Sequence, residues 1–345
     1  MWKEYEIGDD CHNIMYLIDN NVLVDMCRLY YKGCCVHSDE TEALKRFIIH
    51  ARKFGIQCHF ALMEGSFNWK TNQLDVARMQ RTMIAFDALV VSMSDQEIMN
   101  HSGSFDPDIK PANIQKSVKY ESVFDCRLPK MMFEDGEMRY LFYVVYAACL
   151  KIRILQREKN VLLLTKVKEL FRFMVHDLNL FLDKEFFLAT QLFLGKGEEQ
   201  NIARGILKPN KAMDVKSLVN AAMDIFQYRM GCFIVESSRN LLHIPAKIIL
   251  VTQDNAFQQY MERIKTPMTL SSENTITPFD EVSFSIQDRF VDEWETYYNT
   301  QIWPEIKRRA IESHMHEMTE TERKERLVTI RECIEMMEKQ LAGKI

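Results

Sequence analysis

The chain has 345 residues, 47% hydrophobic and 27% charged, with a net charge of −5. This composition is that of an ordinary globular protein, and the charge excludes a global attraction to nucleic acid, so any phosphate binding must come from a local basic patch. Eleven glycines and eight prolines are few for this length and favour long helices over an all-β fold. The length allows either one large domain with an insertion or two domains.

Cysteine spacing and the apolar runs bear on the cell compartment. The nine cysteines lack zinc-finger spacing, no signal peptide precedes them, and the adjacent pair Cys34 and Cys35 does not indicate a disulfide framework. The longest apolar block, residues 140–150, is too short for a bilayer, which needs about 20 residues, so it predicts a buried helix. We therefore expect a reducing, cytoplasmic compartment and no membrane partner.

The first predicted strand, residues 14–18, runs directly into Asp19, and a helical pattern begins after it. A buried strand delivers an acid in this way to the carboxyl edge of an open α/β sheet, where such folds bind ligands. A helix from Ser38 to Gly55 and a short strand at 56–62, followed by Glu64, come next. The order strand, helix, strand predicts a βαβ unit with parallel neighbouring strands.

The predicted structure in the middle of the chain changes from a helix to a loop and then to several helices. Residues 71–91 predict a helix, whereas 92–129 are polar, proline-containing and aperiodic, which is typical of a long surface loop or lid. Residues 137–194 are rich in Leu, Phe, Tyr and Met and predict a helical hairpin or small bundle inserted between two halves of the α/β domain.

The second half of the α/β domain follows the insertion. Residues 214–230 predict a helix, 232–235 a possible strand, and 247–252 a clear strand that leads to Asp254. A helix at 253–264 follows. This second strand that leads to an acid suggests that both acids lie at one sheet edge.

The C-terminal part is predicted to begin with a Ser/Thr/Pro-rich linker, residues 266–278, and to be helical from Asp288 onward. The last helix carries apolar residues at spacings of three and four within a charged sequence. We favour an amphipathic helix docked on its own domain over a coiled-coil dimer seam. These residues are Leu327, Ile330, Ile334, Met337 and Leu341.

Four acids in this order resemble the four motifs of the PIN-like nucleases: Asp19, Glu64, Asp224 and Asp254. The resemblance covers about residues 10–92 and 210–265. It implies an α/β fold with a mostly parallel central sheet flanked by helices. The stretch between the second and third acids is far longer than in a minimal member of the family, and the residues themselves predict a large all-helical insertion there and a helical C-terminal extension. The expected segments are 1–92 and 210–265 for the two halves of the PIN-like domain, 93–136 for the loop or lid, 137–209 for the insertion, and 266–345 for the linker and extension.

The resemblance also implies metal-dependent hydrolysis of phosphodiester bonds. One or two Mg²⁺ or Mn²⁺ ions, held by Asp19, Glu64, Asp224 and Asp254, would activate water, and products would carry 5′-phosphates. Asp214 is an alternative third acid, about 15 Å along a helix from Asp224, and we favour Asp224 because small residues precede it. Clustered carboxylates repel one another, so their pKa values are expected to rise without metal.

Three further residues are expected to support the acids. Thr252 would orient a carboxylate or a bound water, and Asn20 or Asn21 could contact phosphate. In the predicted lid, basic residues alternate with Tyr120 and Phe124, which could stack on unpaired bases. These basic residues are Lys116, Lys119, Arg127 and Lys130. RNA is favoured over DNA by the resemblance alone, and a role as a toxin or defence effector extrapolates from it.

Several alternatives stay open. Asp19 and Asp254 can simply cap the helices that follow them, and Asp25 is expected to be a solvated or capping acid. The chain could be a catalytically inactive PIN-like binding or assembly subunit, or a phosphatase for small substrates. The helical insertion or the C-terminal helix could bind a protein regulator or a second copy. Three or four acids converging within about 5 Å of one ion position would favour the enzyme.

Overall fold

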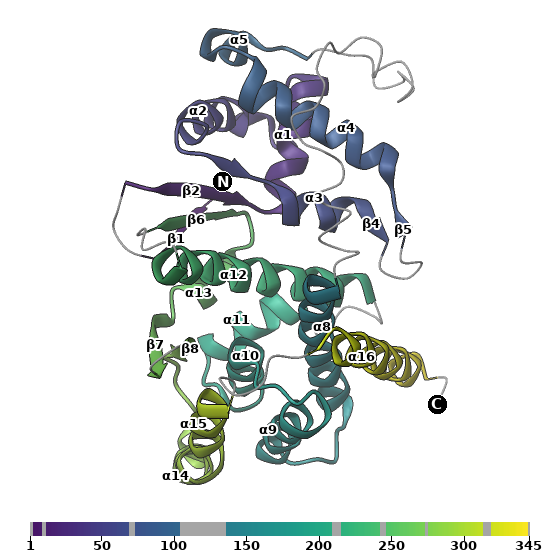
Figure 1. Cartoon of the computed structure of the whole chain (residues 1–345), viewed down its shortest axis with the longest axis vertical. Helices are drawn as coiled ribbons and strands as arrows, with labels where there is room; N and C mark the ends of the chain where they lie inside the picture. Colours follow the sequence, from purple (N-terminus) through teal and green to yellow (C-terminus); the bar gives the residue numbers. More distant parts are fainter. Residues whose placement is uncertain are drawn as a thin grey trace. The chain divides into compact units, whose positions relative to one another are not determined.

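The computed structural model describes residues 3–8, 12–68, 73–103, 136–208, 215–241, 246–272, 275–312 and 319–343. Contacts divide the chain into two compact units. The first combines Met1–Met132 with Gln227–Asp254, and the second combines Phe133–Phe226 with Asn255–Ile345. Helices dominate both units (Figure 1).

The first unit is built on a four-stranded sheet with the order β1-β6-β2-β3. Strand β2 (Ile14–Ile18) pairs in parallel with both β3 (Ile56–Gln57) and β6 (Lys247–Thr252). The predicted parallel pairing of the βαβ unit is therefore confirmed. An additional strand, β1 (Lys3–Gly8), pairs antiparallel with β6, so the sheet is mixed but mostly parallel.

Helices surround this sheet. Helix α1 (Asn20–Lys32) begins at the N-cap Asp19 and ends at Gly33, whose φ of 73° is the left-handed conformation that glycine adopts readily. It packs against α3 and α4. The other described elements are η1 (Ser38–Glu40), α2 (Thr41–Ala51), α3 (His59–Ser66), the hairpin of β4 (Phe67–Asn68) and β5 (Gln73–Leu74), α4 (Val76–Asp87), the π-turn η2 (Ala88–Ser92) and α5 (Asp95–Asn100).

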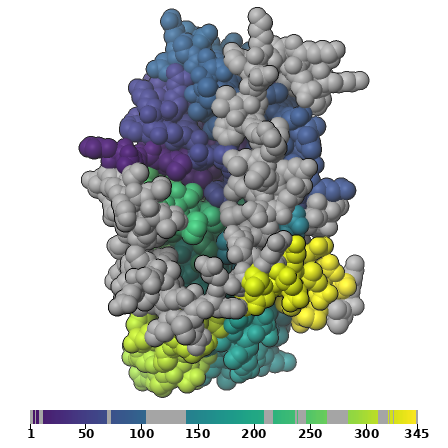
Figure 2. All heavy atoms as spheres, viewed as in Figure 1, coloured from purple at the N-terminus to yellow at the C-terminus, as the bar shows by residue number. Residues whose placement is uncertain are grey.

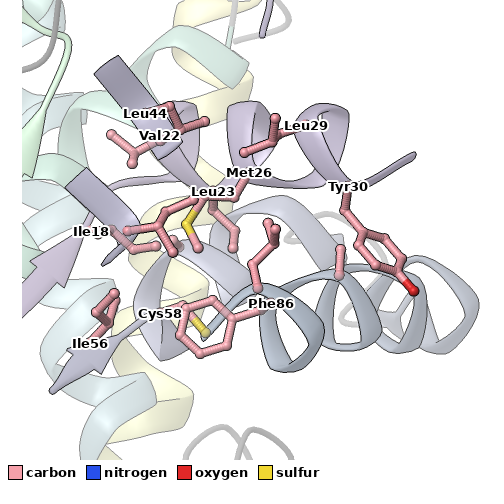
Figure 3. Packing of buried hydrophobic residues seen from close by; sticks show 14 of the residues in the cluster. Ile18, Val22, Leu23, Met26, Leu29, Tyr30, Leu44, Ile56, Cys58 and Phe86 are labelled. Atoms are coloured by element: carbon pink, nitrogen blue, oxygen red, sulfur yellow. The ribbon is translucent and has the colours of Figure 1, made fainter. Parts of the chain in front are cut away.

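The core of this unit holds α1 in place. Val22, Met26 and Leu29 recur at helical spacing and are each 0% exposed. Figure 3 shows them beside Ile18 of β2 and Phe86 of α4 within one buried cluster. The same packing that buries this face of α1 therefore fixes Asp19 at the start of the helix and the polar residues on its other faces.

Three predictions for the first unit are wrong in detail. The strand expected at 56–62 ends at Gln57, because the apolar run after it forms α3, in which the consecutive residues 60–63 are all buried. The loop expected from residue 92 contains α5, which begins with a Ser94–Glu97 capping box. The strand expected at 232–235 lies inside α12 (Val215–Leu241), a helix that belongs to the first unit from Gln227 onward.

The second unit confirms the helical insertion. Helix α10 (Asp183–Leu194) has every residue buried, which explains the high Leu and Phe content of this segment. Among the described residues, the helices fall short of the length and apolar character required to cross a bilayer. The other helices of the insertion are α8 (Gly136–Arg157), α9 (Leu163–Arg172) with the π-turn η3 (Phe173–Asp177), and α11 (Glu198–Leu207), and they are followed by the first half of α12 and by α13 (Asn255–Met261).

The predicted linker is wrong. Strands β7 (Ile264–Ser272) and β8 (Thr275–Val282) form an antiparallel hairpin there. Thr and Ser in this stretch alternate with apolar residues, and Thr and Ile favour strands, whereas the prolines had suggested a loop. The helical tail is confirmed: η4 (Asp288–Phe290), α14 (Val291–Tyr297), η5 (Tyr298–Ile302), α15 (Trp303–Glu312) and α16 (Glu320–Leu341).

The last helix docks within its own unit, as favoured from the sequence. Helix α16 lies against α8, and the Tyr146 hydroxyl donates a hydrogen bond to the Glu338 carboxylate at 2.7 Å. Its apolar residues Ile330, Ile334, Met337 and Leu341 are buried. Val328 and Met336 of the same helix are exposed. Figure 2 draws this C-terminal helix in yellow.

Candidate site at the sheet edge and an adjoining basic groove

Asp19 is held at the carboxyl edge of two parallel strands. Its backbone N–H donates to the Val251 carbonyl of β6 at 3.0 Å. Its Oδ1 accepts a hydrogen bond from the backbone N–H of Val22 at 2.8 Å. Its Oδ2 accepts one from the Thr252 hydroxyl at 2.6 Å and one from the Gln253 backbone N–H at 3.3 Å. With 4% of the residue exposed, Asp19 joins α1 to the end of β6.

Burial governs the protonation of this carboxyl. Desolvation raises the pKa of Asp19, and hydrogen bonds from Thr252 and from the backbone N–H groups of Val22, Gln253 and Asn21 oppose the rise. We had predicted a raised pKa from repulsion among clustered carboxylates. The direction agrees, but the cause is removal from water rather than a neighbouring carboxylate.

Thr252 connects the two acids that end β2 and β6. Its hydroxyl donates to Asp19 and accepts the backbone N–H of Asp254 at 3.0 Å. The side-chain amide of the intervening Gln253 donates to the Asp25 carboxylate at 2.8 Å. The sheet edge is therefore a continuous hydrogen-bonded network that reaches one and a half turns into α1.

Asp25 corrects one prediction. It was expected to be solvated or to cap a helix, but it is 1% exposed, and its second oxygen accepts the backbone N–H of Val36 at 2.8 Å. Asp25 therefore ties the middle of α1 both to Gln253 and to the loop after the helix. Its spacing from Asp19 gave no sign of this role, because both partners come from other parts of the chain.

The remaining acids do not complete the expected cluster in the described structure. Glu64 lies on α3 in the first unit, and Asp224 lies on the part of α12 that belongs to the second unit. There, Cys149 of α8 has a pKa raised first by burial and further by nearby acids that include Asp224. Asp214 lies outside the described residues. In the described ranges, no three His, Cys, Asp or Glu side chains come together as a metal ion requires.

The other predicted residues divide into three groups. Asn20 is partly buried next to Asp19 and lines a groove described below, whereas Asn21 is exposed. Cys34 and Cys35 are free thiols, as are the other described cysteines. The predicted lid contacts Lys116, Lys119, Arg127 and Lys130, with Tyr120 and Phe124, lie outside the described residues.

A groove of about 320 Å³ runs along α1 between α3 and α4, which we call the α1–α4 groove. Four cations among the described residues line it: Arg28 and Lys32 from α1, and Arg78 and Arg81 from α4. The described part of the lining contains no acid. The other lining residues are Asn20, Leu23, Val24, Cys27, Tyr31, Ala61, Leu62, Gly65, Ser66 and Thr82.

These cations lack acidic partners. Within the described part of the chain, none of the four forms an ion pair, and Nε of Arg28 is buried with no hydrogen-bond partner. The guanidinium of Arg81 lies 4.6 Å from the centre of the Tyr31 ring. Burial raises the pKa of Cys27 to about 11, although Thr82 and the two arginines of α4 oppose the rise, so its thiol is neutral at pH 7 and cannot offset the charge.

Sequence reasoning missed this groove and placed its basic patches elsewhere. A signal was present: Arg28 and Lys32 are four residues apart and Arg78 and Arg81 three apart, so each pair shares one face of its helix. Only the packing of α1 against α4 unites the two pairs.

Comparisons with protein-family models, with curated proteins and with solved structures returned no match. What the site can do must therefore follow from its own residues. These are a buried acid fixed at a parallel sheet edge and an adjoining groove lined by cations.

Proposed function

We propose that this chain hydrolyses phosphodiester bonds of nucleic acid at the sheet edge marked by Asp19, in the manner of a PIN-like nuclease. One observation supports this above the others. Asp19 and the Thr252-Gln253-Asp254 segment, which carry the first and fourth motif resemblances, lie side by side where β2 and β6 end, joined by the 2.6 Å hydrogen bond from Thr252 to Asp19. Open α/β sheets bind their ligands at this edge.

The α1–α4 groove supports a polyanionic substrate. Its lining includes Asn20, the residue after Asp19, and its described residues carry four cations and no acid in a chain of net charge −5. A local positive field of this kind attracts nucleic acid despite the overall charge. RNA is proposed over DNA from the resemblance alone, and the role as a toxin or defence effector has the same basis.

Hydrogen bonds from the protein fix both oxygens of the Asp19 carboxylate. The Thr252 hydroxyl and the Gln253 N–H fix Oδ2, and the Val22 N–H fixes Oδ1, so the carboxylate has one orientation. Three of its roughly four acceptor positions are thereby engaged. Mg²⁺ or Mn²⁺, when bound, would activate water and neutralise charge on the phosphate. The described acids of the first unit do not gather in a group of three, so the ion would need further donors beside Asp19.

A second candidate is a PIN-like binding or assembly subunit without catalysis. The 4% exposure of Asp19 and its three hydrogen bonds favour this reading, because they are what a structural N-cap requires. In that case the groove would bind an anionic partner and the sheet edge would only hold the fold together.

The test is cleavage of labelled single-stranded RNA, transfer RNA and single-stranded DNA with Mn²⁺ or Mg²⁺. Wild type is compared with Asp19→Asn and with Asp25→Asn, which alters a second buried carboxylate of the same network that is not a predicted ligand. We expect metal-dependent cutting by wild type that Asp19→Asn abolishes and Asp25→Asn retains in folded protein.

Two other results would count against the nuclease. Equal loss in both variants would show that the network matters for folding rather than for chemistry. No cutting by wild type, with no Mn²⁺ binding by calorimetry, would leave the binding subunit as the better account.

A further inference from the structure

We propose that the α1–α4 groove is a binding site for a compact group with two or more negative charges: the phosphomonoester or polyphosphate of a nucleotide. The site goes beyond the proposed function, because it stands whether or not Asp19 hydrolyses a bond. The nucleotide is either free or the phosphorylated end of a strand. Both sources present the same chemistry to the groove.

Charge is the first argument. Four cations share one cavity of about 320 Å³, and the described residues of its lining include no acid. The chain is not short of acids, having 49 against 44 basic residues, and it pairs other lysines of this unit, such as Lys45 with Glu42 and Lys247 with Glu6. Like charges held close together repel, so an anion entering the groove relieves a cost that the folded chain otherwise carries.

The spacing of the cations indicates a compact, multiply charged group. Arg28 and Lys32 are about 6 Å apart along α1, and Arg78 and Arg81 about 4.5 Å apart along α4. An internal phosphodiester carries a single charge, whereas a terminal phosphate carries nearly two and presents three strong acceptor oxygens. Arginine binds such oxygens in bidentate fashion. The buried Nε of Arg28 has no partner among the described residues, and a phosphate oxygen would satisfy it.

The rest of the lining favours a nucleotide over inorganic phosphate. Leu23, Ala61 and Leu62 offer an apolar surface to the organic part of the ligand. Arg81 is already stacked on Tyr31, and a guanidinium plane is a surface on which a base can stack. Asp75, the N-cap residue that precedes α4, accepts the Arg78 backbone N–H at 3.0 Å.

The experiment measures binding by the full chain in EDTA, where no metal-dependent cleavage intervenes. Fluorescence anisotropy compares a 3′-labelled single-stranded RNA carrying a 5′-phosphate with the same strand carrying a 5′-hydroxyl. ATP and pyrophosphate serve as competitors. We expect the phosphorylated strand to bind at least tenfold more tightly than the hydroxyl strand, or ATP to compete at least tenfold better than adenosine.

Two double variants separate the groove from general electrostatics. Arg28→Gln/Arg81→Gln should weaken binding at least tenfold. Arg46→Gln/Lys53→Gln removes the same charge from exposed positions of the same unit outside the lining and should change it less than twofold. Lys32→Gln, at an exposed position, should weaken binding severalfold, and thermal melting checks that each variant is folded.

The binding results identify the ligand or overturn the proposal. Competition by ATP identifies a free nucleotide as sufficient, whereas preference for the phosphorylated strand without such competition identifies a strand end. Equal binding of both strands with no ATP competition overturns the proposal, as does equal loss in both double variants. Binding is measured in EDTA and does not require cleavage, so failure of the nuclease and failure of this site are distinguishable.

Discussion

The two ends of α1 differ in whether their polar side chains have partners within the protein. At its start, Asp19 is buried and its oxygens accept three hydrogen bonds from three different residues. In its last two turns, Arg28 and Lys32 face a groove without an acid, and Nε of Arg28 is buried with no partner in the described structure. The same helix thus carries a carboxylate whose hydrogen bonds stabilise the fold and two cations that are available to bind a ligand.

This contrast separates stability from binding. A buried group with all its partners contributes to folding, and losing it orphans those partners. A buried or crowded group without partners costs free energy in the folded chain, and such costs are retained where function requires them. The start of α1 should therefore control stability, and its end should control affinity.

The largest expected effect comes from removing Asp19. Asp19→Ala deletes an N-cap and the acceptor of three donors, so it should lower the free energy of unfolding by about 3 kcal/mol. Arg28→Ala, nine residues further along, should change it by less than about 0.5 kcal/mol, since it also removes like-charge repulsion. Chemical denaturation followed by circular dichroism compares the two. Equal losses of unfolding free energy in the two variants would show that both ends of α1 contribute to stability alike.

A second test uses Asp87, a buried acid on α4 with an oxygen that has no hydrogen-bond partner among the described residues. Asp87 is 7% exposed, and its Oδ1 has no hydrogen-bond partner among the described residues. Burial raises its pKa from 3.8 to about 6, so the folded chain holds this proton more tightly than the unfolded chain. Wild type should lose stability as the pH rises from about 4 to about 6.

Asp87→Asn cannot titrate, so it should be more stable than wild type above pH 6, by about 1–3 kcal/mol. The difference should shrink as the pH falls toward 4. Thermal melting at pH 7.5, 6 and 5 measures it. A variant less stable than wild type at pH 7.5 would mean that Asp87 makes a favourable contact. The number of hydrogen-bond partners would then fail to identify which buried groups stabilise the fold.

The smallest effect is expected at Gly65, which lies between Asn20 at the start of α1 and Arg78 of the α1–α4 groove. A Cβ on Gly65 would lie 2.9 Å from Oδ1 of Asn20 and 3.8 Å from Nη2 of Arg78. Gly65→Ala should change stability by less than about 0.5 kcal/mol, because the gain in helix propensity offsets a shift of the Asn20 side chain. It should still weaken nucleotide binding severalfold by narrowing the groove, as titration calorimetry would show. A large loss of stability would instead place Asn20 in the rigid network of the sheet edge.

Local patterns predicted the elements that depend on local periodicity. The apolar runs before Asp19 and Asp254 correctly gave strands β2 and β6, and the spacing of apolar residues in α16 correctly gave its docked face. The errors came where two structures satisfy the same pattern. The run after Gln57 suits a strand or a buried helix, and packing against α1 and α4 chose the helix. The Ser/Thr/Pro-rich stretch was read as a linker because composition does not reveal the pairing of β7 with β8.

The sequence by itself determined that Asp19 and Asp254 follow buried strands, because a strand of apolar residues ending in an acid is a local pattern. Tertiary structure decided what surrounds them. Only the pairing of β2 with β6 brings the Thr252 hydroxyl onto Asp19, and only the packing of α1 on α4 brings Arg28 opposite Arg81 in one groove. Hydrogen bonds and charge repulsion act over a few ångströms between residues far apart in the chain, so their partners are set by the fold.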